Sequence, residues 1–500
     1  MMNDEVYELK IALQNALEQI KILTAQNAKL TAQLAWFQRQ LFGAKSEKFV
    51  PLPDDEPLLP GLESEAQSEP PEPQQVEAHD RKAREKFGWD EIPENLPREE
   101  VIIDVPEAER VGMELIGYEV SERLARRETR FFVIVTKRAK YADKSDALRG
   151  VKTAPAPGDY FDTPSGKTKF DASFIAGLVS DKIENHLPLY RQAEMMAREG
   201  LPMQRSTLCH LFGKTADTLK ILYNRMDELL LQSEIIHADE TPVKLLDPGR
   251  KKCKPAYFWC RMSGIGPPLI TFHFAASRSQ ETANEIYAGY SGTLIRDAYA
   301  GYDALDAGFA ACWAHVRRKF FDAFNAGYLP ADAELKIIRQ LYQLEADAKA
   351  RAELKNTETA LFNERKIIRR TSAKLVKEFF EICRRQAEKE APSSPLVKAI
   401  NYALNLEVAL TEFLTNPKLN IDNNPAENAI RPIALGRKNW LFAGSEGGGQ
   451  HLAILHSFAA TCKANDVNFR AWLEDVLTRL NSTPAAEINS LLPHQWQPGK

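Results

Sequence analysis

Several features that would assign a chain to a particular class are missing from this sequence. No stretch approaches the ~20 consecutive apolar residues of a membrane-spanning helix, and the acidic start has no apolar core of the kind found in signal peptides. The six cysteines are scattered and form no CxxC pair, which is typical of reduced thiols in a cytoplasm. We therefore expect a cytoplasmic protein without a membrane partner.

A phosphate-binding P-loop is also missing. The glycine-rich stretch 444–449 is not followed by Gly-Lys-Ser/Thr, so the backbone cradle that binds nucleotide phosphates is not encoded there. We interpret this stretch as a mobile hinge.

The net charge of −4 is an average over unlike parts of a chain of 500 residues. Residues 51–80 hold nine Asp and Glu and no Lys or Arg, so the net charge becomes +5 once this stretch is set aside. Basic residues cluster elsewhere, as in Arg-Arg-Lys at 317–319, and local clusters matter more than the total for binding phosphates. The composition permits a DNA partner without demanding one, and the length requires several folded units.

The N-terminal part has a heptad pattern. With Leu13 at position a, apolar residues fill nearly all a and d positions of residues 4–42, and Asn27 is the one polar residue at a. This pattern predicts a coiled coil over 1–48, and a lone Asn at a favours dimers, so we expect a homodimer or higher oligomer. The alternative is an amphipathic helix that packs on its own chain.

The next two segments differ in composition. Residues 49–95 are acidic and rich in proline, with few aromatic residues, and predict a disordered linker. Residues 96–155 contain runs in which apolar and polar residues alternate, and predict a small β-rich module.

Residues 156–230 contain a helix-turn-helix pattern. A helix is expected over 187–199 with Pro188 in its first turn, and Gly200 ends it. Ser206 can cap a second helix, and an ordinary helical hairpin stays open as the alternative. The second helix would bury Leu208, Leu211 and Phe212 on one face and present Arg205, Thr207, His210 and Lys214 to DNA.

From residue 233 short apolar strands alternate with helices, which predicts an α/β sheet of mixed direction. Residues 331–417 are helical and charged, without a strand signal, and are typical of an insertion. We assign 231–330 and 418–446 to the interrupted α/β domain and 447–500 to a C-terminal helical region. The expected strands lie near 235–239, 256–262, 269–274, 292–297 and 309–313, with helices near 279–288 and from His315.

Two of these strands are followed by carboxylates. Asp239 and Asp297 each end an apolar strand, and the carboxyl ends of neighbouring strands can converge on one crevice. Two such acids repel each other unless a cation neutralises them, and Mg²⁺ prefers carboxylate oxygens, water and phosphate. Two ions about 3.5–4 Å apart can clamp the oxygens of a phosphoryl transfer. The alternative is that each Asp is a turn residue or a helix cap.

Glu427 has two interpretations. With Asn424 as N-cap and Pro425 as the first helical residue, Glu427 stands where a capping-box Glu belongs. Near a helix start it could instead point into the crevice as a third metal ligand. The basic residues that follow it, Arg431, Arg437 and Lys438, would suit DNA phosphates.

Four strings occur in this order: HADETPVKLL, RDAYAGYDAL, CWAHVRRKFFDA and IDNNPAENAIRPIALGRKNWLFAGSEGG. Together they resemble transposases of the insertion sequence 66 family. The resemblance implies a DDE-type enzyme with an RNase H-like domain, interrupted by the helical insertion, and a catalytic triad of Asp239, Asp297 and Glu427. It also implies the reaction: hydrolysis exposes a 3′-hydroxyl at the element end, and this hydroxyl attacks a target phosphodiester.

The resemblance implies a set of cofactors, partners and supporting residues. Two Mg²⁺ ions are expected at the triad, with Mn²⁺ as a substitute, and the partners are element-end and target DNA, with accessory proteins of the same element, in the nucleoid of a bacterium. For His315 an ordinary structural role stays open. Supporting roles are expected for His315, Arg318, Asn424 and Lys438.

One departure from the family concerns zinc. Relatives carry a cysteine-rich zinc module after the coiled coil, whereas residues 98–155 contain neither Cys nor His, so zinc binding is excluded there and we expect no zinc cofactor. Cys312 and His315 have ligand spacing but supply only half a site, and we interpret them as core.

Two other functions compete with an active transposase. One is a catalytically silent DNA-binding protein derived from a transposase. The other is a metal-dependent nuclease that cuts without strand transfer.

Overall fold

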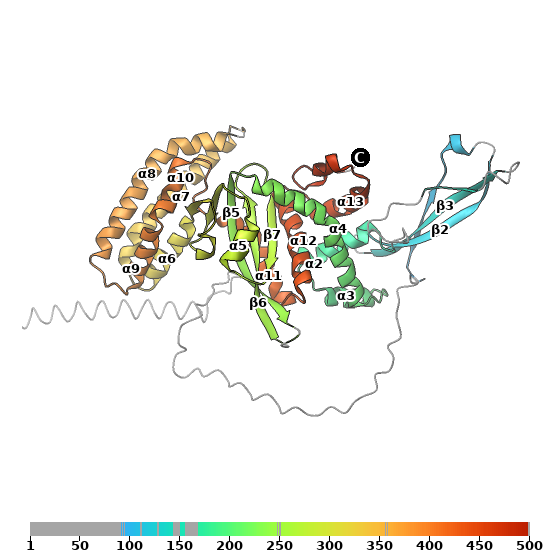
Figure 1. The fold of residues 1–500 in the computed structure, drawn as a ribbon, viewed down its shortest axis with the longest axis horizontal. Coiled ribbons are helices and arrows are strands. Elements are labelled where there is room, and N and C mark those ends of the chain that lie inside the picture. The colour runs from blue at the N-terminus through green and yellow to red at the C-terminus, as the bar shows by residue number, and fades with distance from the viewer. Residues whose placement is uncertain are drawn as a thin grey trace, which may run out of the picture. The chain divides into compact units, whose positions relative to one another are not determined.

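The fold is given by a computed structural model (Figure 1), which describes residues 92, 94, 96–110, 113–127, 130–143, 151–155, 169–247, 249, 252–355, 357 and 359–498. The predicted coiled coil, and nearly all of the predicted linker, lie outside the described residues. Residues 89–324 and 330–500 form one compact unit, to which the sheets and helices below belong. None of the described helices is long and apolar enough to cross a membrane.

The first sheet contains four strands in the region expected to be β-rich, and the strand prediction is confirmed. Strand β3 lies at its centre, parallel to β1 and antiparallel to β2 and β4, so the sheet is mixed. A small core under it includes Tyr141, whose hydroxyl donates to Asp104 Oδ1 over 2.6 Å. The strands are β1 (Arg98–Ile103), β2 (Met113–Arg127), β3 (Arg130–Asp143) and β4 (Val151–Thr153).

Three helices follow, α2 (Ala172–Ile183), α3 (Leu189–Arg198) and α4 (Arg205–Leu231). Gly200, with φ of +83°, ends α3 as predicted. Two cap predictions are wrong. Pro188 is the N-cap of α3 and not part of its first turn, and Ser206 lies inside α4, which begins after the extended Gln204 and has no side-chain cap. The predicted apolar face is confirmed, because Leu208, Leu211 and Phe212 are all buried.

The second sheet has the order β7-β6-β5-β8-β9. Strands β5, β6 and β7 are antiparallel, whereas β8 and β9 run parallel to β5. Asp239 does not end its strand as predicted: β5 pairs with β8 only up to His237, but its pairing with β6 carries it on to Asp247. The strands are β5 (Ile235–Asp247), β6 (Lys252–Ser263), β7 (Ile270–Ala275), β8 (Thr293–Arg296) and β9 (Gly308–Ala311).

Within the described residues of 331–417 the chain is helical, as predicted, and has no strand. Trp313 connects the two ends of this segment: its backbone N–H donates to Ile421 O, and its indole N–H donates to Leu410 O, both over 3.0 Å. The chain therefore leaves the sheet after β9 and comes back beside the same point, at Ile421. The helices between β7 and this return are α5 (Gln280–Ile286), α6 (Trp313–Asn325), α7 (Asp332–Glu353), α8 (Ala360–Ala387), α9 (Pro395–Asn405) and α10 (Glu407–Thr415).

The last helices are α11 (Asn424–Trp440), α12 (Glu446–Ala464) and α13 (Phe469–Arg479). Helix α12, orange-red in Figure 1, lies along β7, where Thr461 Oγ1 and Ser457 Oγ accept hydrogen bonds from backbone N–H groups of the strand. An edge strand is thus covered by a helix. Short 3-10 helices cover Glu107–Glu109, Ala300–Tyr302, Leu329–Ala331, Leu480–Ser482 and Ala485–Leu491.

The interpretation of 444–449 as a mobile hinge is wrong. Ser445 caps α12 by accepting a hydrogen bond from Gly448 N over 3.0 Å, so most of the glycines form the first turns of this helix. Gly449 packs against the ring of Phe274 of β7, and a Cβ atom added to it would lie 2.6 Å from the ring carbons. Helix and strand approach this closely because the residue between them has no side chain.

Candidate active site

Asp239 and Asp297 lie at the same level of neighbouring parallel strands. Ile235 pairs with Thr293 and His237 with Ile295, so the register brings Asp239 opposite the residue that directly follows β8. That residue is Asp297. Both carboxylates are partly buried, at the place where β5 and β8 separate.

Asn423 fastens the start of α11 to β5. Its Nδ2 donates to Ala238 O over 2.7 Å, and its Oδ1 lies 3.0 Å from His237 Nδ1. Its carbonyl accepts the first helical hydrogen bonds, so Asn423 is the N-cap, and the predicted cap at Asn424 is wrong by one residue. The capping-box interpretation of Glu427 is wrong as well, because the N-cap residue Asn423 makes no side-chain capping bond.

His237 is held in a single protonation state. Asn420 Nδ2 donates to Nε2 over 2.9 Å, so Nδ1 carries the proton and donates to Asn423 Oδ1. Burial lowers the pKa of His237 to about 4, which keeps the imidazole neutral at physiological pH. The ring therefore acts as a bridge between β5 and the segment that leads into α11.

The far end of α11 is fastened to the same strand. Arg437 Nη1 donates to Thr241 Oγ1 over 3.1 Å and also to the carbonyl of Pro242. After the helix, Ala443 N donates to Lys244 O over 2.8 Å. Because both ends of α11 are fixed on β5, the helix presents Glu427 to the strand that carries Asp239.

Burial and neighbouring charges both act on the carboxyl group of Asp239. Burial raises the pKa of Asp239 well above its ordinary value, and the negative charges of Glu240, Glu427 and Asp297 raise it further. Two of the acids that the sequence singled out, Asp297 and Glu427, thus lie near enough to Asp239 for their charges to act on it. We call Asp239, Asp297 and Glu427 the acid cluster.

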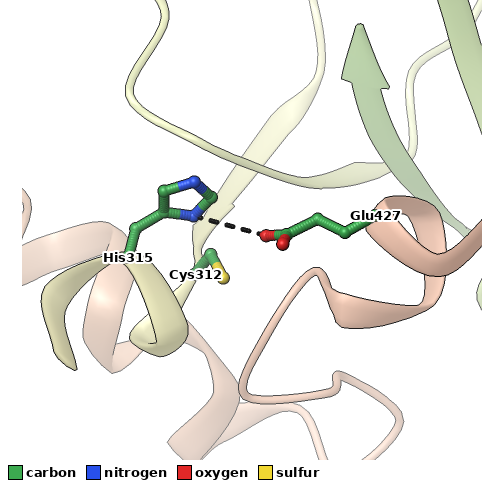
Figure 2. A group of neighbouring side chains, drawn as sticks. All are labelled: Cys312, His315 and Glu427. Atoms are coloured by element: carbon green, nitrogen blue, oxygen red, sulfur yellow. Dashed lines mark ion pairs between the residues drawn. The ribbon is translucent and has the colours of Figure 1, made fainter. Parts of the chain in front are cut away.

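Glu427 lies beside His315 and Arg318 of α6 and beside Cys312, the residue that precedes this helix; Figure 2 shows it with His315 and Cys312. Its Oε1 lies 3.8 Å from His315 Nδ1, and its Oε2 lies 3.7 Å from Arg318 Nη2. Both distances exceed hydrogen-bond length. Burial lowers the pKa of His315, against the opposing effect of the Glu427 charge. Cys312 is buried beside them, and burial raises the pKa of its thiol to about 12.

A second carboxylate next to Asp239 was missed by the sequence reasoning. Glu240 is almost fully buried, accepts a hydrogen bond from Arg278 Nε over 2.7 Å and is also bonded by the Tyr302 hydroxyl. Arg278 in turn lies over the ring of Tyr299, 3.6 Å from its centroid. This network fixes the backbone beside Asp239. Only the adjacency of two acids in the sequence hinted at it.

The remaining predicted site residues lie on α11 and α4. Asn424 bonds Asp422 through Nδ2 over 2.7 Å, while Arg431 and Lys438 are exposed on α11. The four residues proposed to contact DNA lie on α4, where Arg205 and His210 are exposed and Thr207 and Lys214 are partly exposed.

Comparisons with known proteins identify the family. Residues 167–451 match the family described as "Transposase IS66 family", residues 457–494 match "IS66 C-terminal element", and residues 29–101 match "Transposase C of IS166 homeodomain". Similar proteins include the uncharacterized proteins y4qI and y4jD of Sinorhizobium fredii (strain NBRC 101917 / NGR234). The first is 33% identical over 99% of this chain and 92% of its own length, and the second is 29% identical over 96% and 97%. The chain therefore belongs to the IS66 family of transposases.

Proposed function

We propose that this transposase is a DDE-type enzyme that cuts DNA at element ends and joins them to target DNA, with Asp239, Asp297 and Glu427 as its catalytic acids. The observation that carries the proposal is geometric: the register of β5 and β8 sets Asp239 opposite Asp297, and Glu427 lies on a helix whose two ends are fixed on β5. The mixed sheet supports it: antiparallel β7-β6-β5 followed by parallel β8 and β9 is compatible with the RNase H-like domain that we propose.

The acid cluster fits a divalent metal. Carboxylate oxygens are the ligands that Mg²⁺ prefers, and Glu427 Oε1 is buried without a hydrogen-bond partner among the described residues. Asp239, Asp297 and Glu427 would hold the metal, with Mn²⁺ as a substitute for Mg²⁺. A metal bound there would polarise a phosphodiester and activate the attacking oxygen.

The proposed reaction has two phosphoryl transfers. In the first, water attacks the phosphorus at the element end, the bond to the 3′ oxygen breaks, and a 3′-hydroxyl is freed. In the second, this hydroxyl attacks a target phosphodiester and releases a target 3′-hydroxyl. Asn423 and His237 would act by positioning Glu427 through α11, and Arg318, beside Glu427 and well exposed, could contact a DNA phosphate.

Other parts of the chain would bind DNA or a second copy. The residues proposed for DNA are Arg205, Thr207, His210 and Lys214 of a helix-turn-helix formed by α3 and α4, with Arg431, Arg437 and Lys438 of α11. The homeodomain match over 29–101 gives independent support for DNA binding. We further propose that residues 1–48 form a coiled coil that joins subunits.

The test measures metal-dependent cleavage and joining of the element's own end DNA. Asp239→Asn, Asp297→Asn and Glu427→Gln should each abolish both products while DNA binding persists. Glu446→Gln is the matched control, because Glu446 lies on the next helix and is paired with Lys254 at 3.2 Å. Activity retained by Glu427→Gln would overturn the triad.

The same assay separates the competing functions. Cleaved ends without joined product would favour a nuclease. Binding by the wild type without any cleavage, in the presence of the accessory proteins, would favour a silent DNA-binding protein.

A further inference from the structure

Three side chains of different chemistry converge beside the acid cluster. Cys312, which precedes α6, His315 in the first turn of α6 and Glu427 on α11 place one ligand atom each within 4.8 Å of one another (Figure 2). We call them the Cys-His-Glu cluster. Of these, the proposed reaction uses only Glu427.

Two atoms of this cluster are buried and unsatisfied. His315 Nδ1 and Glu427 Oε1 are shielded from solvent, and neither has a hydrogen-bond partner in the described part of the chain. They face each other across 3.8 Å, which is too long for a hydrogen bond but suits two ligands of one cation between them. A buried polar pair left open in this way is explained when both atoms bind a metal.

The third ligand is already oriented. Cys312 Sγ accepts a hydrogen bond from Asn423 N over 3.2 Å, and backbone N–H donors of this kind support metal-bound sulfur. Asn423 thereby contacts both the sulfur ligand and the start of the helix that carries Glu427.

We propose that the Cys-His-Glu cluster is a zinc site, and that zinc bound there inhibits DNA cleavage by withdrawing Glu427 from the acid cluster. Sulfur, imidazole nitrogen and one carboxylate oxygen favour Zn²⁺, whereas Mg²⁺ selects oxygen ligands. Three protein ligands leave the fourth position to water. The site itself is independent of the proposed catalytic role of Glu427, but the inhibition rests on it.

The site is tested by spectroscopy on the metal-free full-length chain. Co²⁺ is titrated as a zinc surrogate, and the expected result is a thiolate-to-cobalt absorption band that saturates at one ion per chain and disappears when Zn²⁺ is added. Cys312→Ser should remove the band. Cys209→Ser and Cys253→Ser are the matched controls: both thiols are exposed and lie outside the Cys-His-Glu cluster, so both variants should keep the band.

The outcomes are distinct. A band that is absent from the wild type, or that survives in Cys312→Ser, overturns the zinc site. His315→Gln is the second variant, in case Cys312→Ser unfolds; it should weaken zinc affinity by about a hundredfold or more, since even changes around a ligand cost 10–100-fold. Thermal unfolding of each variant establishes that it is folded.

The inhibition is tested by comparing cleavage rates with and without Zn²⁺ at saturating Mg²⁺. The wild type should be inhibited, and the ratio of the two rates should approach one in His315→Gln and Cys312→Ser. Equal inhibition of all three proteins would overturn the inhibitory role. If the wild type never cleaves DNA, the proposed function fails, while the cobalt spectrum still decides the site.

Discussion

Asn423 shows how one amide can position a helix. Its side chain bonds the backbone of Ala238 and the ring of His237, while its backbone N–H, which Ala would keep, donates to the sulfur of Cys312. We expect Asn423→Ala to lower the free energy of unfolding by about 1–3 kcal/mol, because it leaves buried polar groups without partners. The cleavage rate should fall by more than the loss of folded protein accounts for, since Glu427 lies on the same helix. Urea unfolding and the cleavage assay measure the two effects.

The neighbouring residue provides the control for this prediction. Asn424 is exposed, and among the described residues its side chain bonds Asp422, two residues earlier in the chain. Asn424→Ala should therefore change stability by less than about 0.5 kcal/mol. Equal losses in the two variants would contradict a positioning role for Asn423.

Glu334 makes the stability of the chain depend on pH. Its side chain is fully buried in α7, and burial raises its pKa to about 7. The folded chain thus keeps this proton at pH values where the unfolded chain, in which the pKa of Glu334 is the ordinary 4.5, has lost it. Stability should fall as pH rises from about 4.5 to 7.

Glu334→Gln should remove this fall, because the amide resembles the protonated acid. At pH 8 the variant should be more stable than the wild type by a few kcal/mol, since one pKa unit corresponds to about 1.4 kcal/mol. Urea midpoints at pH 5 and pH 8 measure the difference. Asp332→Asn, in the same helical turn but partly exposed, is the control. Its urea midpoint should change between pH 5 and pH 8 by the same amount as that of the wild type.

At the residue scale, sequence reasoning worked where chemistry is local. Asp239 and Asp297 could be selected because each follows an apolar run, and Glu427 because it stands near a helix start. The partnership of His237 with Asn423 could not be predicted, because 186 residues separate the two and nothing near either one marks it. Separation along the chain also explains why Cys312 and His315 were interpreted as half a site, since the third ligand comes from α11.

At the scale of elements, two glycines of α12 should respond oppositely to the same substitution. A methyl group at Gly447 would meet nothing within 4 Å, whereas at Gly449 it would collide with the Phe274 ring. We expect Gly447→Ala to stabilise the chain by about 0.5–1 kcal/mol, since Ala is the better helix former. Gly449→Ala should destabilise it by about 1–3 kcal/mol through overpacking.

Thermal or urea unfolding of the two variants checks this prediction, and each variant is the control for the other. A gain in stability from both would mean that α12 does not pack closely on β7. The prediction also explains why a glycine-rich stretch was misinterpreted from sequence. Glycine signals flexibility only where nothing presses against it, and the partner here, β7, is distant in the sequence.

Periodicity predicted most of the other elements, including the strands of the second sheet and the helices of 331–417. It could not predict how far β5 continues. The segment beyond Asp239 pairs along its length with β6, and on its other side it meets Ala443 through an isolated bridge at Leu245. It includes Pro242, which a strand tolerates where no neighbour needs its N–H. The order of the strands in the sheet could not be predicted from the sequence either, because it depends on which distant segments pair.

At the scale of the whole molecule, the heptads of residues 4–42 predict self-association. The full chain should sediment as a dimer or larger species at micromolar concentration. Leu13→Asp with Leu34→Asp should give monomers, since charges at position a cannot be buried in a coiled coil. Gln14→Asp with Ala35→Asp, at the outward b positions, is the matched control. Dissociation by the control pair would contradict this heptad register.

The order of the acids along the chain has a consequence for protein synthesis. A ribosome delivers Asp239 and Asp297 long before Glu427, and the contacts that hold β5 and cover β7 come from α11 and α12, which are made last. A chain released early would keep α3 and α4 but lack the third acid and its supports. On the proposed function, such fragments would occupy element ends without cutting them. A gene copy truncated late in its reading frame would then inhibit transposition by the full-length protein.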